Sequence, residues 1–450
     1  MMARVLYTLA LLALLPWAVL HLLWRARRQP DYLKHWGERF GCFRPRPPGP
    51  LIWIHAVSVG ETRAAQPLIA ALAQRFPDHR ILLTHMTPTG RATAKALFGG
   101  SVTRSYLPYD TPWAVRRFLR HYRPDIGIVM ETELWPNLIA ACTQACVPLL
   151  LVNARLSDKS ARRYARFPNL TRTALRSLSA IGAIGAEDAR RLQALGAPAV
   201  EVVGNMKFDL ATPAAQLALG QSFRNRAGGR PVFLCASTRE GEEALILDAW
   251  EKVFGKAESL AALGTATAWR PAPSGLVGGG TAGNALLAIV PRHPQRFDEV
   301  ARLIEARDFA LQRRSDDRAI EADTQVWLGD SMGEMFAYYA AASVDGVAFV
   351  GGSLLDFGCQ NLIEACTAGT PVLLGPSTYN FADAARDALA AGAARQVQDA
   401  GDLVAQALEL LGNPAARPAM AEAGRAFAAR HQGATASTLN LIERFIPATR

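Results

Sequence analysis

The sequence predicts an α/β protein of two Rossmann-like domains that face each other across a cleft, preceded by an N-terminal membrane anchor helix. Three observations lead to this prediction. The chain has 450 residues, half of them hydrophobic, which is enough for two cores. Apolar runs of strand length alternate with helical patterns, as expected for parallel sheets covered by helices on both faces. A polar stretch bearing alanines and glycines, Asp209 to Gly229, interrupts this alternation.

The N-terminal segment is the first element of the chain. Val5 to Trp24 is a run of twenty residues without a charged side chain, long enough to cross or deeply enter a bilayer. A signal peptide would have its charges before the apolar run, whereas here the cluster RARR follows it. We therefore expect residues 1–28 to be a retained anchor, with the globular part on the cytoplasmic side. A helix lying within one leaflet is the alternative, although the run has no polar face.

Basic residues are concentrated before the first expected strand. The first fifty residues hold eight arginines and lysines against two acidic residues, so they account for +6 of the formal net charge of +10. Because no basic cluster with interleaved aromatic residues follows, we expect the basic connector 29–50 to meet anionic membrane lipids and not nucleic acid. The six cysteines form no CxxC pair and no Cys/His set at zinc spacing, which fits a reduced, cytosolic chain.

The strand-like runs predict an N-terminal domain at 51–210, a linker at 211–230 and a C-terminal domain at 231–450. The first domain has runs at 51–56, 81–85, 126–130, 147–152, 181–184 and 200–203. The second has runs at 232–235, 286–290, 326–328, 347–350 and 372–374. Residues 261–284, rich in Gly, Ala and Pro, are expected to form a mobile surface insertion. Its GGGTAG motif precedes a strand instead of following one, which argues against a dinucleotide site.

The stretch from Trp53 to Ala65, WIHAVSVGETRAA, predicts a buried strand that turns sharply into a helix. Glu61 lies on this turn, at the carboxyl end of a parallel strand, where ligands bind in open α/β sheets. Gly60 leaves room for a substrate to approach the backbone. A glutamate in the first helical turn is also favoured by the helix dipole. From these residues alone, a catalytic and a purely structural Glu61 are equally supported.

Two more polar clusters follow strands of the first domain. Glu131 follows the run at 126–130, and Lys207 follows the run at 200–203. Because the carboxyl ends of parallel strands meet at one edge of a sheet, we expect both side chains near Glu61. Two carboxylates and an ammonium could polarise a hydroxyl and hold an acidic sugar. An ion-pair network between loops is the alternative.

The second domain has polar clusters at the corresponding positions. Arg292, in PRHP, suits a phosphate. GDSMGEM, Gly329 to Met335, offers backbone N–H groups at a helix start. QNLIEA places Asn361 and Glu364 one helical turn apart, where the acid could accept from ribose hydroxyls. Each cluster alone is explained as a helix cap or a solvated loop, but together they favour a nucleotide-sugar site.

These motifs, taken in order, resemble those of the 3-deoxy-D-manno-octulosonic acid (Kdo) transferases of lipopolysaccharide assembly. The resemblance extends from WGERFG nearly to the C-terminus and rests on the motifs WIHAVSVGET, THMTPTG, YLPYD, ETELWPNLI, NARLSDKSA, GNMKFD, PRHPQRF, GDSMGEM, FVGGSL and QNLIEA. It implies a glycosyltransferase of the B-type fold, monotopic on the inner membrane. The implied reaction moves Kdo from CMP-Kdo to the lipid A precursor lipid IVA.

The resemblance also implies roles for individual residues. Glu61 would be the general base, and Glu131 and Lys207 would stabilise the transition state. The residues implied to bind CMP are Pro291, Arg292, Gly333, Glu334, Met335, Asn361, Leu362, Ile363 and Glu364. The chain departs from the family pattern at the insertion 261–284 and at Cys359, which stands where a glycine usually precedes the next two polar residues.

The chemistry of the donor agrees with the residues. CMP leaves with a single phosphorus, which an arginine and helix N–H groups can neutralise in place of a metal, and the chain contains no DxD motif. We therefore expect inverting transfer without a cofactor. Two alternatives remain: a lipid-directed glycosyltransferase of the same fold that uses another nucleotide sugar, and a non-catalytic nucleotide-binding scaffold. The joint presence of Glu61, Glu131 and Lys207 counts against the scaffold.

Overall fold

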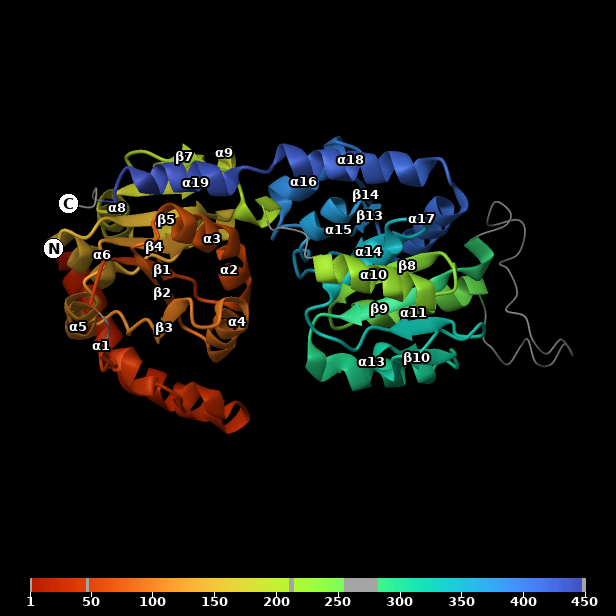
Figure 1. The fold of residues 1–450 in the computed structure, drawn as a ribbon, viewed down its shortest axis with the longest axis horizontal. Coiled ribbons are helices and arrows are strands. Elements are labelled where there is room, and N and C mark those ends of the chain that lie inside the picture. Colours follow the sequence, from red (N-terminus) through yellow and green to blue (C-terminus); the bar gives the residue numbers. More distant parts are fainter. Residues whose placement is uncertain (1, 46–47, 210–213, 255–281, 447–450) are drawn as a thin grey trace, which may run out of the picture. The chain divides into compact units, whose positions relative to one another are not determined.

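A computed structural model describes residues 2–45, 48–209, 214–254 and 282–446 (Figure 1). The chain forms two compact units, one of Met1–Leu210 with His431–Arg450, the other of Ala211–Arg430. In the described part of each unit, seven parallel strands form one sheet. Together with the apolar N-terminal helix, these sheets confirm the predicted α/β fold class. Most of the insertion expected at 261–284 lies outside the described residues.

The sheet of unit 1 has the strand order β3-β2-β1-β4-β5-β6-β7. Its strands are β1 (Leu51–His55), β2 (Arg80–His85), β3 (Val102–Tyr106), β4 (Ile126–Met130), β5 (Leu149–Ala154), β6 (Ala180–Ala183) and β7 (Glu201–Val202). The order reverses between β1 and β4, which pair directly. Such a reversal opens a crevice at the carboxyl ends of the two strands.

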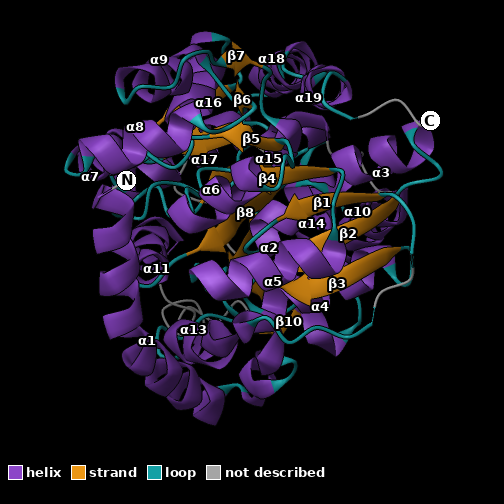
Figure 2. Cartoon of the chain, turned by 90° about the vertical axis from the view of Figure 1, so that its left-hand side faces the viewer, coloured by secondary structure: helices purple, strands orange, loops and turns teal. Residues whose placement is uncertain are grey.

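Helices cover both faces of this sheet (Figure 2). Along β1, Leu51 and Trp53 belong to one core cluster while Ile52 and Ile54 belong to the other, as the two-residue period of a strand requires. The helices of the first face are α5 (Pro112–Tyr122), α6 (Pro136–Gln144), α8 (Pro168–Arg176) and α9 (Ala186–Ala194). The second face has α2 (Val59–Ala64), α3 (Gln66–Arg75), α4 (Pro88–Phe98) and α19 (Ala434–Glu443). The remaining helical segments are η1 (Pro30–Leu33), η2 (Trp36–Phe40), α7 (Asp158–Ala165) and η3 (Met206–Asp209).

The C-terminal helix α19 packs on unit 1, although more than two hundred residues separate it from the rest of that unit (Figure 1). Its Leu441 and Ile442 are buried beside α3. The Asp209 carboxylate accepts hydrogen bonds from the backbone N–H groups of Gly433, at 2.7 Å, and Thr435, and so fixes the start of the helix.

The sheet of unit 2 has the order β10-β11-β9-β8-β12-β13-β14 and reverses between β8 and β12. Its strands are β8 (Val232–Thr238), β9 (Leu286–Pro291), β10 (Leu311–Arg313), β11 (Val326–Leu328), β12 (Val347–Val350), β13 (Val372–Leu374) and β14 (Ala394–Gln396). Its helices are α10 (Ala214–Arg226), α11 (Glu242–Phe254), α13 (Phe297–Glu305), α14 (Met335–Ala342), α15 (Ile363–Ala368), α16 (Ala382–Ala390), α17 (Ala400–Gly412) and α18 (Ala416–Arg430). The shorter turns are η4 (Ala282–Asn284), η5 (Pro294–Arg296) and η6 (Arg314–Asp316).

Helix α10 lies where the sequence predicted a linker. It packs against α14, and a Cβ on Gly220 would come within 2.8 Å of the Ala337 carbonyl oxygen, so the glycine permits close helix contact. The buried Phe223 ring packs against Trp327 and Tyr338. The glycine that helped to suggest a linker therefore serves helix packing, and the buried residues of α10 are Gly220 and Phe223.

The N-terminal helix α1 (Met2–Arg28) lies on the outside of unit 1 (Figures 1 and 2). Among the described residues, it is the one helix long and apolar enough to cross a membrane, judged by length and composition. Its large apolar side chains are mostly exposed. A helix with such a surface is compatible with a membrane anchor.

Candidate functional site

Glu61 is held at the turn between β1 and α2 by its own hydrogen bonds. Its two carboxylate oxygens accept from the Val57 N–H and from the Ser58 hydroxyl, each at 2.8 Å. Ser58 is also the N-cap of α2 and accepts from the Glu61 N–H at 3.4 Å. The backbone and the side chain of Glu61 thus both bond to the Ser58 hydroxyl at the start of the helix. Glu61 therefore does have the structural role that the sequence suggested, and the same bonds fix its carboxylate in one orientation.

Glu61 is only 7% exposed. Burial, followed by the charge of Glu131, raises the pKa of its carboxyl from 4.5 to about 7, against the opposing hydrogen bonds from Val57 and Ser58. A carboxyl with this pKa exchanges its proton near neutral pH, which is the property that a general base needs.

Glu131 follows β4, the direct neighbour of β1. Its backbone has φ 55°, a left-handed conformation that is unfavourable for a residue with a side chain, and its N–H donates to the Val152 carbonyl. Backbone strain of this kind is common at functional sites. The Lys207 Nζ atom lies 3.6 Å from a Glu131 carboxylate oxygen.

Lys207 is positioned by two asparagines. The Asn205 side-chain oxygen accepts from the Lys207 N–H at 3.0 Å, and that of Asn153, at the end of β5, accepts from the Met206 N–H at 3.1 Å. These bonds attach the η3 turn to the edge of the sheet where Glu131 lies. The structure thus brings Glu61, Glu131 and Lys207 together, as the strand-end argument predicted.

Glu133 is a fourth member of this cluster that the sequence reasoning missed. Burial, and then the charge of Glu131, raises the pKa of its carboxyl from 4.5 to about 7. Its charge in turn contributes to the raised pKa of Glu61. Its position two residues after Glu131, in the same short loop, was the available signal. Unit 1 therefore gathers three acidic side chains and one lysine at the crevice between β1 and β4.

In unit 2, Pro291 ends β9 and Arg292 follows it as an exposed residue. The Arg292 N–H donates to the Thr238 carbonyl, and its Nε donates to the Gln360 side-chain oxygen at 3.2 Å. Burial, followed by the charges of Arg239, Arg292 and Arg296, lowers the pKa of His293. This end of the β8–β9 pair is therefore electropositive and can attract an anion.

The segment Gly333–Met335 leads into α14. Gly333 has φ 82°, which favours glycine, and Glu334 occupies the N-cap position. The Glu334 carboxylate accepts from Arg314 at 3.2 Å. An arginine, a glutamate and the free N–H groups of a helix start can together bind a polar ligand.

Asn361 and Glu364 make the contact expected from their spacing. The Asn361 amide donates to the Glu364 carboxylate at 3.0 Å, and its oxygen accepts from the Ile363 N–H at 3.1 Å. Leu362 and Ile363 are buried in the core, so they offer a ligand only their backbone groups. Cys359 has φ 70°, a left-handed backbone conformation that glycine adopts most readily.

Glu242 is a buried carboxylate of unit 2 that the sequence reasoning also missed. One of its oxygens accepts from the N–H groups of Arg239 and Gly352, at 2.8 and 2.7 Å, and the other from Leu354 at 3.0 Å. It therefore fastens the loop after β12 to the turn after β8. In the described part of the chain, no group of three or more His, Cys, Asp or Glu side chains is arranged to hold a metal ion.

Comparisons with known proteins agree with this arrangement of the fold. Residues 34–210 match the model of the 3-deoxy-D-manno-octulosonic-acid transferase family. The chain is 46% identical to a 3-deoxy-D-manno-octulosonic acid transferase of Bordetella pertussis, over 99% of this chain and 100% of that protein. It is 35% identical to one of Haemophilus influenzae, over 99% of both.

The structure is also similar to that of a UDP-GlcNAc 2-epimerase from Neisseria meningitidis, with a TM-score of 0.57 and 14% identity over 88% of this chain and 100% of that one. At that identity the likeness concerns the fold alone. The two transferase relatives and the family model show more: this chain belongs to the 3-deoxy-D-manno-octulosonic acid transferase family of glycosyltransferases.

Proposed function

We propose that the protein transfers Kdo from CMP-Kdo to lipid IVA on the cytoplasmic side of the inner membrane, with inversion at the anomeric carbon and with Glu61 as the general base. The family membership supports the transferred sugar. The exposed apolar surface of α1 supports a reaction at a membrane, where a lipid acceptor lies.

The acceptor reaction is assigned to unit 1. A hydroxyl oxygen of the acceptor attacks the anomeric carbon of Kdo on the face opposite the phosphate, its proton passes to the Glu61 carboxylate, and the bond from carbon to the CMP oxygen breaks. CMP leaves with the electron pair of that bond. The Glu131 carboxylate and the Lys207 ammonium stabilise the charges that develop on the sugar ring and its carboxylate.

Donor binding is assigned to unit 2. Arg292 pairs with the phosphate of CMP, and N–H groups at Gly333–Met335 and at the start of α15 donate hydrogen bonds to the remaining acceptor groups of the nucleotide. The Glu364 carboxylate, oriented by Asn361, accepts from ribose hydroxyls. Pro291 and Leu362 shape the backbone around the nucleotide.

The observation that carries the proposal is the buried Glu61 carboxyl with a pKa of about 7 beside Glu131 and Lys207. An isolated capping glutamate would lie in solvent and would have no charged neighbours of this kind. A carboxylate that is fixed by two hydrogen bonds and titrates near neutrality is suited to remove a proton from a hydroxyl.

The test is a donor panel read by mass spectrometry. Purified full-length protein is incubated with lipid IVA and, separately, with CMP-Kdo, another CMP-sugar or UDP-sugars. We expect a mass increase of one or more Kdo units with CMP-Kdo alone, and an inverted anomeric configuration in the product by NMR. Transfer from a UDP-sugar, or no transfer to lipid IVA, would contradict the proposal.

A further inference from the structure

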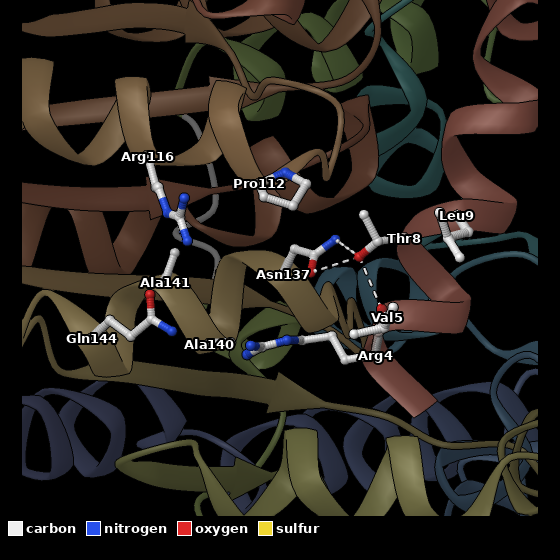
Figure 3. A pocket seen from close by; sticks show the side chains of 10 residues that line it. All are labelled: Arg4, Val5, Thr8, Leu9, Pro112, Arg116, Asn137, Ala140, Ala141 and Gln144. Carbon is white, nitrogen blue, oxygen red and sulfur yellow. Dashed lines mark hydrogen bonds between the residues drawn. The ribbon is translucent and has the colours of Figure 1, made fainter. Parts of the chain in front are cut away.

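A hollow of about 210 Å³ lies in unit 1 between the first turns of α1, the start of α5 and the side of α6 that carries Asn137 and Gln144 (Figure 3). Its lining includes Arg4, Val5 and Leu9 from α1, Arg116 from α5, and Asn137 and Gln144 from α6. None of these residues belongs to the Glu61 cluster. The volume is below the roughly 300 Å³ of a pocket for a drug-sized molecule, so the hollow suits a small group.

Hydrogen bonds hold the walls of the hollow in place. The Tyr7 hydroxyl donates to the Asp110 carboxylate at 3.0 Å, and the side chains of Thr8 and Asn137 are hydrogen-bonded at 3.0 Å. Asp110 also accepts from the N–H groups of Asn137 and Leu138, at 2.9 and 2.7 Å. The first turns of α1 are therefore fixed to the N-terminus of α6, and the hollow is a built feature of the fold.

The hollow is basic. Arg4 extends from α1 toward α6, and Arg116 borders the hollow from α5 (Figure 3). Among the residues that the structure describes, neither guanidinium is hydrogen-bonded or ion-paired with another side chain. The Asp110 carboxylate attracts Arg4, but it is 2% exposed and already accepts three hydrogen bonds. Two guanidinium groups at one small hollow are suited to an oxyanion with several acceptor oxygens.

One wall of the hollow continues into the apolar surface of α1. Val5 and Leu9 both line the hollow and are 51% and 57% exposed. A ligand bound here would therefore have its charged group between the arginines and its apolar part along α1. A phospholipid with an anionic headgroup has this combination of a phosphate and acyl chains.

We propose that this hollow binds the phosphate of an anionic membrane phospholipid and so seats the start of α1 at the lipid headgroups. The proposal concerns a lipid that is neither donor nor acceptor. It requires that α1 contact the membrane, but it does not depend on the transfer chemistry proposed for Glu61.

The test uses the full-length protein in a nonionic detergent and native mass spectrometry. The protein is titrated with phosphatidylglycerol, with phosphatidylcholine and with inorganic phosphate. We expect the first phosphatidylglycerol molecule to bind more tightly than further ones and more tightly than phosphatidylcholine. An equal concentration of inorganic phosphate should not displace it. Arg116→Ala and Arg4→Ala should each weaken this first binding event about 10-fold, because each removes a charge-assisted contact.

Two further variants distinguish lipid binding in the hollow from attraction of the lipid to general surface charge. Arg120→Ala removes an exposed arginine one helical turn after Arg116 and should leave binding unchanged. Ala140→Phe fills the hollow without changing the charge and should weaken binding as the arginine variants do. An equal loss in Arg120→Ala, no preference for phosphatidylglycerol, or equally strong binding of inorganic phosphate would overturn the proposal. So would displacement of the bound lipid by an equal concentration of lipid IVA, because the hollow would then be part of the acceptor site.

Discussion

Two glutamates occupy equivalent places in the two sheets and differ in what surrounds them. Glu61 follows β1 and Glu242 follows β8, and each lies beside the reversal of strand order in its unit. Both are buried. Glu242 accepts three backbone hydrogen bonds, from Arg239 after β8 and from Gly352 and Leu354 after β12. Glu61 accepts one backbone bond and one hydroxyl bond, and the charges of Glu131 and Glu133 add to burial in raising its pKa.

This difference separates a carboxylate that holds two loops together from one that is proposed to take part in proton transfer. Burial raises the pKa of Glu242, and hydrogen bonds from backbone N–H groups to its carboxylate oppose part of that rise. At Glu61 the charges of Glu131 and Glu133 add to the effect of burial. A carboxylate whose oxygens are occupied by N–H donors, like that of Glu242, holds the backbone in place. A carboxylate that lies close to other carboxylates, like that of Glu61, takes up a proton more readily.

The largest effect is expected for Glu61→Gln. Glutamine keeps the shape and can still bond to Val57 and Ser58, but it cannot accept a proton, so turnover should fall about 10²- to 10⁴-fold while CMP affinity is unchanged. The matched control is Glu187→Gln, since Glu187 is a half-buried first-turn glutamate of α9, after another strand of the same sheet. Full turnover in a folded Glu61→Gln protein would show that the residue is only a helix cap.

Arg292→Ala should produce the opposite pattern. Loss of a charged contact to the donor phosphate is expected to weaken CMP-Kdo binding about 10- to 100-fold, with a smaller effect on turnover at saturating donor. Arg302→Ala, which removes an exposed arginine of α13 in the same unit, is the control. Steady-state kinetics with varied donor measure both parameters. A fall in kcat at unchanged donor KM would remove Arg292 from the donor site.

Glu242→Gln should affect stability and not chemistry. A glutamine has one acceptor oxygen where the glutamate has two, so at least one buried N–H of the 352–354 loop loses its partner. We expect this loss to lower the free energy of unfolding by about 1–3 kcal/mol. Denaturant unfolding of this variant and of Glu61→Gln, under the same conditions, compares their free energies of unfolding. If Glu242→Gln retained wild-type stability but lost turnover at saturating donor, the contrast between the two glutamates would be wrong.

Glu133→Gln should have the smallest effect. It removes a negative charge near Glu61, and because that charge contributes to the raised pKa of Glu61, the pKa should fall. In a plot of turnover against pH, the rise on the acidic side should then move to lower pH. The displacement should be less than about one unit, since Glu133 is itself partly protonated near pH 7. A rise displaced to higher pH would mean that Glu133 stabilises the ionised Glu61 instead.

The central strands and the strand-end residues were predictable from the sequence. Runs such as Leu51–His55 are apolar on both faces because helices cover both sides of the sheet, and parallel strands bring their carboxyl ends to one edge. That rule was sufficient to place Glu131 and Lys207 near Glu61. The spacing of Asn361 and Glu364 likewise predicted their contact.

Three kinds of feature were not predictable by the same reasoning. Strands β3, β10 and β14 were missed because they lie toward the edges of their sheets and include half-buried or exposed polar residues such as Thr103 and Arg395, so no continuous apolar run marks them. Helix α10 was missed because Gly220 and Phe223 are its buried residues, so no apolar face of helical period marks it in the sequence. The partners of Glu133 and Glu242 depend on loops that only the folded chain brings together.

The pH dependence of turnover, compared between the wild type and Glu61→Gln, tests the central claim most directly. A base must be ionised to act, and the pKa of Glu61 is raised to about 7, so wild-type kcat should rise about tenfold per pH unit below 7 and level off above it. The residual activity of Glu61→Gln should not show this rise with pH between pH 5 and 8. A wild-type profile that is flat over this range, or the same rise in the Gln variant, would contradict the assignment of Glu61 as the base.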